Sequence, residues 1–370
     1  MLAERTKHFD SSGIRKVFDL AARLEDPINL SIGQPDFDVP TDVRKSAIQA
    51  IESRKNAYSP SQGIAPLRDR LQADINAKYG HADRKVFVCS GTSGGLTLAM
   101  LALVDPGDEV LFFDPYFVMY PALCRLAGGI PVPIDNAPDF RLDVEKLEAA
   151  ITPKTKMIVV NSPANPTGVV ATQQQLRDVA DLARRHNLVL VSDEIYSQFQ
   201  FDEDFVSPAQ FNEQTVVIDG FSKSHAMTGW RVGIVHGPSE IVDTMIKLQQ
   251  YTFVCSPQPA QWAALTAIDV GMESHLADYR RKRDFMVDAL SPYYDIATPG
   301  GAFYIYPAAP ASFGNSGTKL VHAAIEKNLL IIPGNIFSAA DSHFRISYAA
   351  DDEMLRRGVD VLIDLAKGGA

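Results

Sequence analysis

The hydrophobic pattern changes its period repeatedly along the chain, and this change predicts an α/β fold. Between Lys85 and Val191, short runs of β-branched residues alternate with segments whose apolar residues recur every three or four positions. The first pattern is typical of buried strands and the second of amphipathic helices, so together they indicate a mostly parallel sheet covered by helices. We expect strands near 86–89, 109–113, 130–134, 157–160 and 188–192, then near 215–219 and 231–235.

Helical periodicity continues outside this region. Thr172 and Gln175 form a capping-box pattern at the start of one expected helix. The full set of expected helices covers 13–24, 41–53, a segment starting near Pro66, the segment after the first strand, 172–186, 240–251, 258–270, 277–290 and a closing helix from about 351. The last third of the chain mixes short strands with helices and has the rhythm of a smaller α+β lobe.

Composition narrows the possible functions. The chain has 370 residues, and its 35 Lys and Arg against 45 Asp and Glu give a net charge of −10, without a dense basic tract. This balance argues against nucleic acid or an anionic membrane as a partner. The three cysteines are widely spaced, which favours neither a metal site nor a disulfide framework, and no apolar signal core or membrane-length run is present. We therefore expect a cytoplasmic protein without a metal.

The stretch from Ser222 to Arg231 (SKSHAMTGWR) carries the strongest chemical signal. A lysine amine is a nucleophile toward carbonyls once its pKa falls, and the small neighbours of Lys223 leave room for a bulky aldehyde cofactor. Arg231 can clamp a phosphate. A Ser-Lys-Ser tripeptide alone is far more typical of an ordinary surface loop, so the interpretation depends on the longer stretch and on the other groups that such a cofactor needs.

Those other groups have candidates at the ends of expected strands. Asp193 follows an apolar strand, where ligands of open α/β sheets collect, and its carboxylate would hold a proton on a pyridine nitrogen. Tyr196 and Asn165 can each donate to a phenolic oxygen. The small-residue turn 90–95 would suit a phosphate at a helix start, although it equally suits a glycine-rich connector.

These motifs together resemble the class I and II aminotransferases, pyridoxal-phosphate enzymes of fold type I. The resemblance covers essentially the whole chain and is most specific at 165–168 (NPTG), 193–196 (DEIY), 222–231 and 344–347 (FRIS). It implies a three-layer large domain with a mostly parallel sheet, plus a smaller α+β domain. We expect the large domain to span 43–276 and the small domain to be formed by both termini, 1–42 and 277–370.

The resemblance also implies roles for individual residues. Lys223 would form the Schiff base with pyridoxal 5'-phosphate and move protons, with Asp193 on the ring nitrogen and Tyr196 and Asn165 on the phenolic oxygen. Substrate would contact Arg345, through its α-carboxylate, together with Gly33 and Asn165. The remaining cofactor contacts would be Thr92, Ser93, Ser222 and Arg231 on the phosphate, Phe117 stacked on the ring, and Tyr58 reaching across from the partner subunit of a homodimer.

Two departures from the family pattern concern the cofactor. Gly220 stands where a phosphate-binding serine is often found, so Ser222 would have to replace that contact. Phe117 stands where tryptophan is frequent, which makes the stacking face smaller.

The resemblance implies amino-group transfer from an amino acid to a 2-oxo acid by a ping-pong route. The alternatives are a lyase or decarboxylase on the same fold, because the same cofactor serves several bond cleavages. A non-catalytic sensing module is less favoured, since no helix-turn-helix extension or basic arm is present. The identity of the amino acid does not follow from the motifs.

Overall fold

A computed structural model describes residues 2–3, 6–7 and 24–368 of the chain. Its centre is a seven-stranded sheet with the order β2-β8-β7-β6-β5-β3-β4. All neighbouring strands are parallel except β8, which is antiparallel to both β2 and β7. The strands are β2 (Lys85–Cys89), β3 (Glu109–Asp114), β4 (Ile130–Asp135), β5 (Thr155–Asn161), β6 (Val189–Asp193), β7 (Val216–Gly220) and β8 (Gly233–Gly237).

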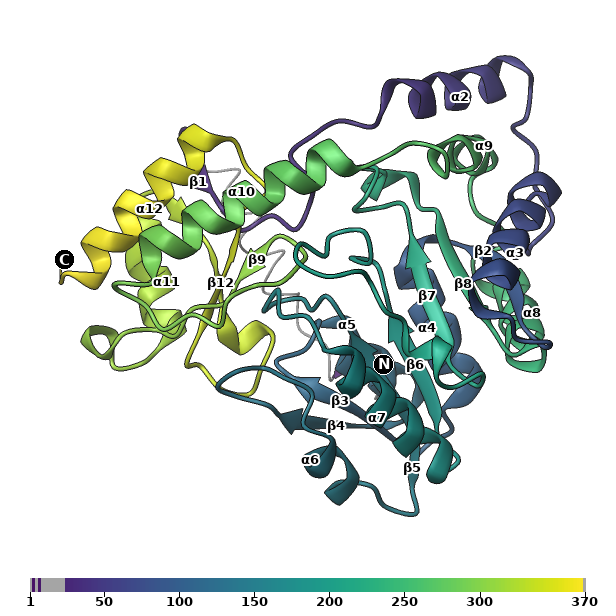
Figure 1. The fold of residues 1–370 in the computed structure, drawn as a ribbon, viewed down its shortest axis with the longest axis horizontal. Coiled ribbons are helices and arrows are strands. Elements are labelled where there is room, and N and C mark those ends of the chain that lie inside the picture. The colour runs from purple at the N-terminus through teal and green to yellow at the C-terminus, as the bar shows by residue number, and fades with distance from the viewer. Residues whose placement is uncertain (1, 4–5, 8–23, 369–370) are drawn as a thin grey trace.

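Helices cover both faces of this sheet because alternate strand residues point to opposite sides and both sides are apolar. One face packs against α4 (Gly91–Leu103), α5 (Met119–Ala127) and α8 (Ser239–Thr252). The other face packs against α6 (Val144–Ala149) and α7 (Gln173–Arg185) at one end. At its other end it packs against α2 (Thr41–Glu52), α3 (Ala65–Tyr79) and α9 (Gln258–Ala267). The result is the expected three-layer arrangement (Figure 1).

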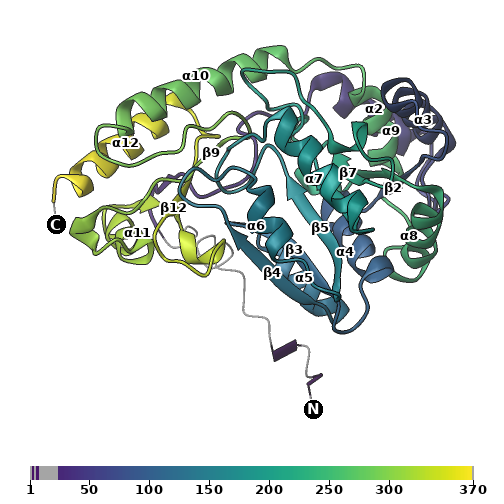
Figure 2. The same cartoon turned by 60° about the horizontal axis from the view of Figure 1, so that its bottom comes forward.

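The C-terminal part of the chain builds a second, smaller body beside the large sheet (Figures 1 and 2). Its three-stranded antiparallel sheet has the order β11-β12-β9, and β1 pairs with β10 in parallel. The elements are β1 (Ile28–Asn29), α10 (Glu273–Leu290), β9 (Tyr304–Ile305), α11 (Gly317–Glu326), β10 (Leu329–Leu330), β11 (Ile332–Pro333), β12 (Phe344–Ser347) and α12 (Asp352–Ala366). The N-terminal strand β1 therefore joins the C-terminal elements in one core.

Among the described residues, one short 3-10 helix bears on the site: η3 (Thr228–Trp230), just before β8. The loop between β7 and η3 contains Lys223, so the lysine follows the carboxyl end of a central strand. The carboxyl ends of parallel strands meet at one edge of the sheet, where ligands of open α/β sheets bind.

All seven predicted strands are present within two residues of their expected limits. The capping box at the start of α7 forms as expected, with the Thr172 side chain accepting from Gln175 N and the Gln175 side chain accepting from Thr172 N. Two expectations need correction. Residues 91–95 are not a turn before the helix but the first turns of α4, and α10 begins at Glu273, four residues earlier than predicted. Most of the helix expected over 13–24 lies outside the described residues.

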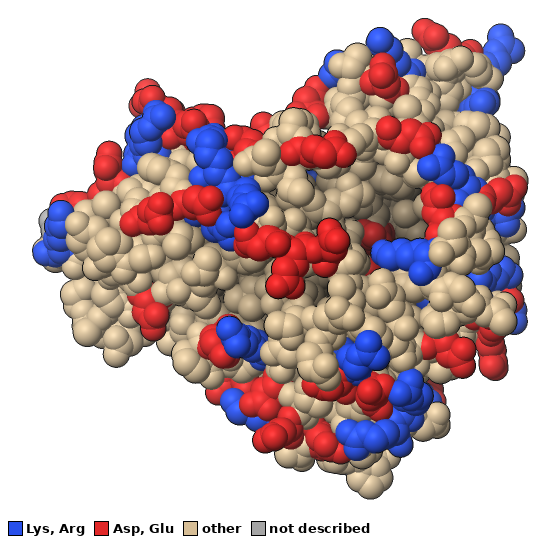
Figure 3. All heavy atoms as spheres, viewed as in Figure 1, with Lys and Arg blue, Asp and Glu red and all other residues tan. Residues whose placement is uncertain are grey.

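The surface gives no sign of a large basic area on the face in Figure 3, where acidic and basic side chains are intermixed. Within residues 2–3, 6–7 and 24–368, no helix combines the length and apolar character needed to cross a bilayer.

Candidate active site

A cavity of about 560 Å³ lies where the carboxyl edge of the large sheet faces β9 and β12. It brings together every residue that the sequence assigned to the site except Tyr58. The lining consists of Gly33, Gln34, Thr92, Ser93, Phe117, Asn161, Asn165, Asp193, Ile195, Tyr196, Ser222, Lys223, Thr228, Gly229, Arg231, Tyr304 and Arg345. Its volume suits a small-molecule cofactor together with a substrate.

Lys223 lies three residues beyond the end of β7, and its amine projects into this cavity. Its Nζ donates to the carbonyl oxygen of Gly33 at 2.6 Å. Burial, together with the positive charges of Arg345 and Arg231, lowers the pKa of Lys223 to about 8, against the opposing effect of Asp193. The lowered pKa leaves a minor neutral fraction of this amine at neutral pH, far more than an ordinary lysine has, and only this neutral form is a nucleophile toward an aldehyde.

Asp193 ends β6, next to β7, and its carboxylate is 3% exposed. Its Oδ2 accepts from the hydroxyl of Tyr120 at 2.8 Å. Burial raises the pKa of Asp193 to about 6, and the hydrogen bond from Tyr120 opposes that rise. At neutral pH the group is therefore a buried carboxylate facing the cavity, which suits a cationic ring nitrogen. Sequence reasoning missed Tyr120, which lies on α5, a helix that was not among the expected ones.

The opposite end of the cavity is built for an anion. The helix α4 begins at Gly91, and its N-cap Ser90 makes no side-chain capping bond, so the first backbone N–H groups of the helix remain available. Thr92 and Ser93 line the cavity there. Arg231 stands over this turn, with Nη2 at 3.4 Å from the Ser90 carbonyl oxygen. A side chain at position 91, where φ is +71°, would collide with the Arg231 guanidinium.

The structure gives a packing reason for glycine at position 220. A Cβ atom at Gly220 would lie 3.1 Å from both the Gly233 Cα and the Val232 carbonyl oxygen on the adjacent strand. These are backbone atoms of a paired strand and yield little, so a serine here would require β7 and β8 to shift apart. Ser222, which is 5% exposed, lines the cavity two residues later.

Arg345 lies on β12, the central strand of the three-stranded sheet, and is 2% exposed. Its Nη1 donates to Asn165 Oδ1 at 2.9 Å and its Nη2 to the Ser31 carbonyl oxygen at 2.8 Å. Its Nε is buried and has no hydrogen-bond partner among the described residues. A buried guanidinium with an unused donor fits a carboxylate, which accepts two parallel N–H bonds.

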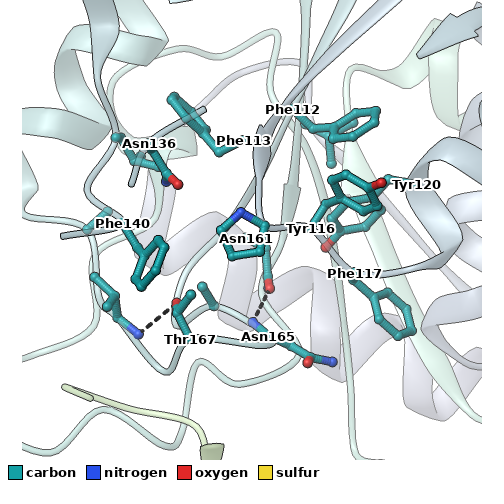
Figure 4. Close-up of a pocket in the computed structure, with 16 residues that line it drawn as sticks. Phe112, Phe113, Tyr116, Phe117, Tyr120, Asn136, Phe140, Asn161, Asn165 and Thr167 are labelled. Carbon is teal, nitrogen blue, oxygen red and sulfur yellow. Dashed lines mark hydrogen bonds between the residues drawn. The ribbon is translucent and has the colours of Figure 1, made fainter. Parts of the chain in front are cut away.

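Aromatic groups complete the walls. Phe117 follows β3 and lines the main cavity, and Figure 4 shows its ring beside Asn165 at the edge of a second cavity of about 40 Å³. Backbone N of Asn165 donates to Asn161 Oδ1 at 2.9 Å, which fixes the loop after β5. Because Asn165 Oδ1 accepts from Arg345, the amide nitrogen of Asn165 is left as a donor toward the cavity. Tyr304, also missed from the sequence, contacts Tyr196 through their hydroxyls at 2.8 Å.

Tyr58 lies apart from the cavity of its own chain. It is 84% exposed and borders a separate hollow formed with residues 255–259. Its contact with a partner subunit's site stays a prediction.

The comparison with known families agrees with this geometry. Residues 25–362 match the family "Aminotransferase class I and II". The chain belongs to this family and has its fold-type I architecture. It is an enzyme that transfers amino groups between amino acids and 2-oxo acids with pyridoxal phosphate as cofactor.

Individual relatives align over nearly their whole length. An aspartate aminotransferase of Pyrococcus abyssi is 34% identical, with 97% of this chain and 96% of the relative aligned. An aromatic-amino-acid aminotransferase of Thermococcus litoralis is 35% identical over 97% of this chain and 96% of the relative. The solved structure of a Thermus thermophilus aspartate aminotransferase with maleate superposes with a TM-score of 0.93 at 33% identity, covering 99% of both chains.

The residues present fit pyridoxal phosphate. The cavity offers an amine of lowered pKa at Lys223, a buried carboxylate at Asp193 and an anion-binding helix start beside Arg231. These groups match the aldehyde, ring nitrogen and phosphate of the cofactor in chemistry, and they lie around one cavity.

Proposed function

We propose that Lys223 is the residue that binds the cofactor covalently and moves the substrate's α-proton. The observation that carries this proposal is that a lysine of lowered pKa shares one cavity with the buried Asp193 carboxylate and with the unused Nε donor of Arg345. When bound, the cofactor supplies an electron sink for the charge left at the α-carbon. Asp193 keeps the ring nitrogen protonated, and Tyr196 and Asn165 donate to the phenolic oxygen.

Arg345 is proposed to bind the substrate's α-carboxylate, with Asn165 and the Ser31 carbonyl holding the guanidinium in place. A fixed bidentate contact orients the amino acid so that its α-hydrogen faces the Lys223 nitrogen. Lys223 then takes that proton and returns it to the cofactor side, which is general acid–base catalysis by one group. Gly33 contributes its backbone at the substrate end of the cavity.

The phosphate is proposed to lie against Thr92, Ser93, Ser222 and Arg231, with Phe117 stacked on the ring. Tyr58 would complete the phosphate site from the partner subunit of a homodimer, which is consistent with its exposure and its distance from its own cavity. We further propose that residues 43–276 form the cofactor-binding domain and that 1–42 with 277–370 form the smaller one.

The substrate range is proposed to include neutral or acidic amino acids, because relatives of similar identity are named for aspartate and for aromatic amino acids. A panel of single amino acids, each incubated with the loaded enzyme without any oxo acid, tests both range and reaction type. Transfer predicts one oxo acid released per active site and conversion of the cofactor to its amine form. Continuous release of ammonia or carbon dioxide would instead identify a lyase or decarboxylase.

Lys223→Ala tests the assigned lysine. We expect kcat to fall by at least about 1,000-fold, because both the covalent attachment and the proton transfer are lost. Lys154→Ala, which removes an exposed lysine before β5, serves as the matched control and is expected to keep wild-type turnover. Turnover of the Lys223 variant at the wild-type rate would overturn the assignment.

A further inference from the structure

Tyr304 occupies a position between the two functional ends of the cavity. Its side chain is 1% exposed and lines the cavity. Its hydroxyl lies 2.8 Å from the hydroxyl of Tyr196, and the Arg345 guanidinium carbon lies 4.5 Å from the centroid of its ring. One residue therefore contacts both the group assigned to the cofactor's phenolic oxygen and the group assigned to the substrate's carboxylate.

The register of the small sheet fixes this position. Tyr304 on β9 pairs directly with Ser347 on β12. Arg345 is two residues from Ser347 and therefore on the same face, at the diagonal position that an aromatic side chain can reach. The backbone pairing thus holds the Tyr304 ring against the guanidinium, independently of any ligand.

The chain also leaves space for the Tyr304 hydroxyl. A Cβ atom at Gly33 would lie 2.6 Å from that hydroxyl oxygen, so any side chain at position 33 would displace it. The same glycine accepts the hydrogen bond from Lys223 Nζ through its carbonyl. Tyr304, Gly33 and Lys223 are therefore packed in a continuous row.

We propose that Tyr304 is a positioning residue that holds Tyr196 through its hydroxyl and Arg345 through its ring. The proposal rests on the functions proposed above for Tyr196, Arg345 and Lys223. Its two contacts are chemically separable, because phenylalanine at position 304 keeps the ring and loses only the hydroxyl.

The hydroxyl contact has a definite direction once the cofactor is bound. The Tyr196 hydroxyl then donates its hydrogen bond to the cofactor's phenolic oxygen. Tyr304 must therefore be the donor, and the Tyr196 oxygen the acceptor, in the bond between the two tyrosines. Burial raises the pKa of Tyr304, which keeps its proton in place at neutral pH. Hydrogen bonds in a chain strengthen one another, so the Tyr304 donor strengthens the bond from Tyr196.

That strengthening acts on the proton at the Lys223 nitrogen. A phenolic oxygen that accepts a stronger hydrogen bond carries less available charge and attracts this proton less. The pKa of the protonated Lys223 nitrogen is therefore lower. Among the described residues, the other charged or titratable groups facing Tyr196, Tyr304 and Lys223 are Asp193, Arg345, Arg231, Tyr120 and Tyr348. Tyr304→Phe leaves all of these in place.

The test uses the cofactor-loaded enzyme and its visible absorption as a function of pH. For Tyr304→Phe we expect the midpoint of the absorption change to rise by about 0.3 to 0.5 pH unit, because a cooperative hydrogen bond contributes roughly 10–30% of the bond it supports. Affinity for an α-methyl amino acid, which uses the carboxylate site but has no α-proton to lose, should stay within about twofold, since the ring contact with Arg345 remains.

Tyr304→Leu removes the ring as well. It should reproduce the rise in the midpoint and in addition weaken binding of the α-methyl amino acid by about three- to tenfold, the range of a buried cation–π contact. Tyr294→Phe is the matched control. Tyr294 is another buried tyrosine, but its hydroxyl donates at 2.7 Å to the Leu362 carbonyl, and it does not line the cavity. This control should change neither quantity.

The outcomes separate this proposal from the one on which it rests. If the loaded wild-type enzyme and the loaded Lys223→Ala variant have the same visible absorption, the proposed function itself is refuted. If the wild type titrates as expected but the midpoint of Tyr304→Phe is unshifted, only the positioning by the Tyr304 hydroxyl is refuted, and the proposed function is unaffected. If Tyr304→Leu does not fold, the Tyr304→Phe midpoint still decides, because that change removes a single oxygen atom.

Discussion

The two walls of the cavity are built in different ways. On the sheet wall, Asp193 ends β6 and Lys223 follows the end of β7, so two adjacent parallel strands bring them together. On the opposite wall, Arg345 is held by Asn165 and Ser31, which lie 180 and 314 residues away in the chain. The first wall is thus a product of local strand ends, whereas the second exists only when distant segments have packed.

The electrostatics of the two walls differ as well. Burial shifts the pKa of Asp193 upward and that of Lys223 downward, so both groups on the sheet wall can change charge near neutral pH. Arg345 keeps its charge when buried because a guanidinium is hardly deprotonated in proteins. The sheet wall is therefore suited to moving protons, and the opposite wall is suited to holding a fixed anion.

Arg345→Lys should impair the opposite wall, and of the changes that distinguish the two walls it should have the largest effect. Lysine keeps the charge but loses the planar fork, so at least one charge-assisted hydrogen bond to the substrate disappears. We expect kcat/KM to fall about 100-fold, with cofactor affinity unchanged. Steady-state kinetics and cofactor titration measure the two quantities, and Arg356→Lys, an exposed arginine on α12, is the control. Loss of cofactor affinity equal to the loss of kcat/KM would show that the two walls do not act separately.

Arg231→Ala should act on the opposite function. Gly220 offers no side chain, and a Cβ atom there would be tight against the backbone of Gly233, so in the proposed site the phosphate would depend more strongly on Arg231 and the start of α4. We expect the dissociation constant of the cofactor to rise about 30-fold, the value of one charge-assisted hydrogen bond. Equilibrium dialysis of the cofactor checks this, with Arg125→Ala on α5 as a surface control. An unchanged dissociation constant would mean that Arg231 does not contact the phosphate.

The pH dependence of cofactor loading tests the lowered pKa of Lys223 on the sheet wall, and it has the smallest expected effect. Only the neutral amine of Lys223 attacks an aldehyde, and a pKa of about 8 leaves this form minor at pH 7. The rate of covalent loading should therefore rise about tenfold between pH 7 and pH 9 and level off above it. Stopped-flow absorbance of cofactor-free enzyme follows the rate. A rise that continues to pH 10.5 would indicate an ordinary, solvated lysine.

Much of the sheet wall was predictable from the sequence. The strands around it are apolar runs that fold the same way in many contexts, and polar residues directly after such runs must lie at the carboxyl edge of a parallel sheet. Asp193 and Lys223 follow such runs and lie at this edge, and the resemblance to aminotransferases predicted their roles together with Arg345 and the phosphate turn. All of these residues line a single cavity.

The contacts that orient those residues were not predictable. Tyr120 donates to Asp193 and Tyr304 contacts Tyr196, yet neither tyrosine belongs to a pattern that distinguishes it from a core aromatic residue. Arg345 on its own resembled a surface charge on an edge strand, but it lies on a central strand and is buried. Sequence periodicity reports which face of an element is apolar, and it carries no information on which distant side chain packs against it.

The sequence by itself thus determined the α/β layers, because these depend on local propensity and hydrophobic period, and its motifs, through their resemblance to the aminotransferases, singled out Lys223. Only the tertiary structure decided that Gly33 makes room for Tyr304 and accepts from Lys223, that a side chain at Gly220 would be tight against Gly233, and that Arg345 Nε has no partner among the described residues. These features depend on distances between segments far apart in the chain, which packing alone fixes.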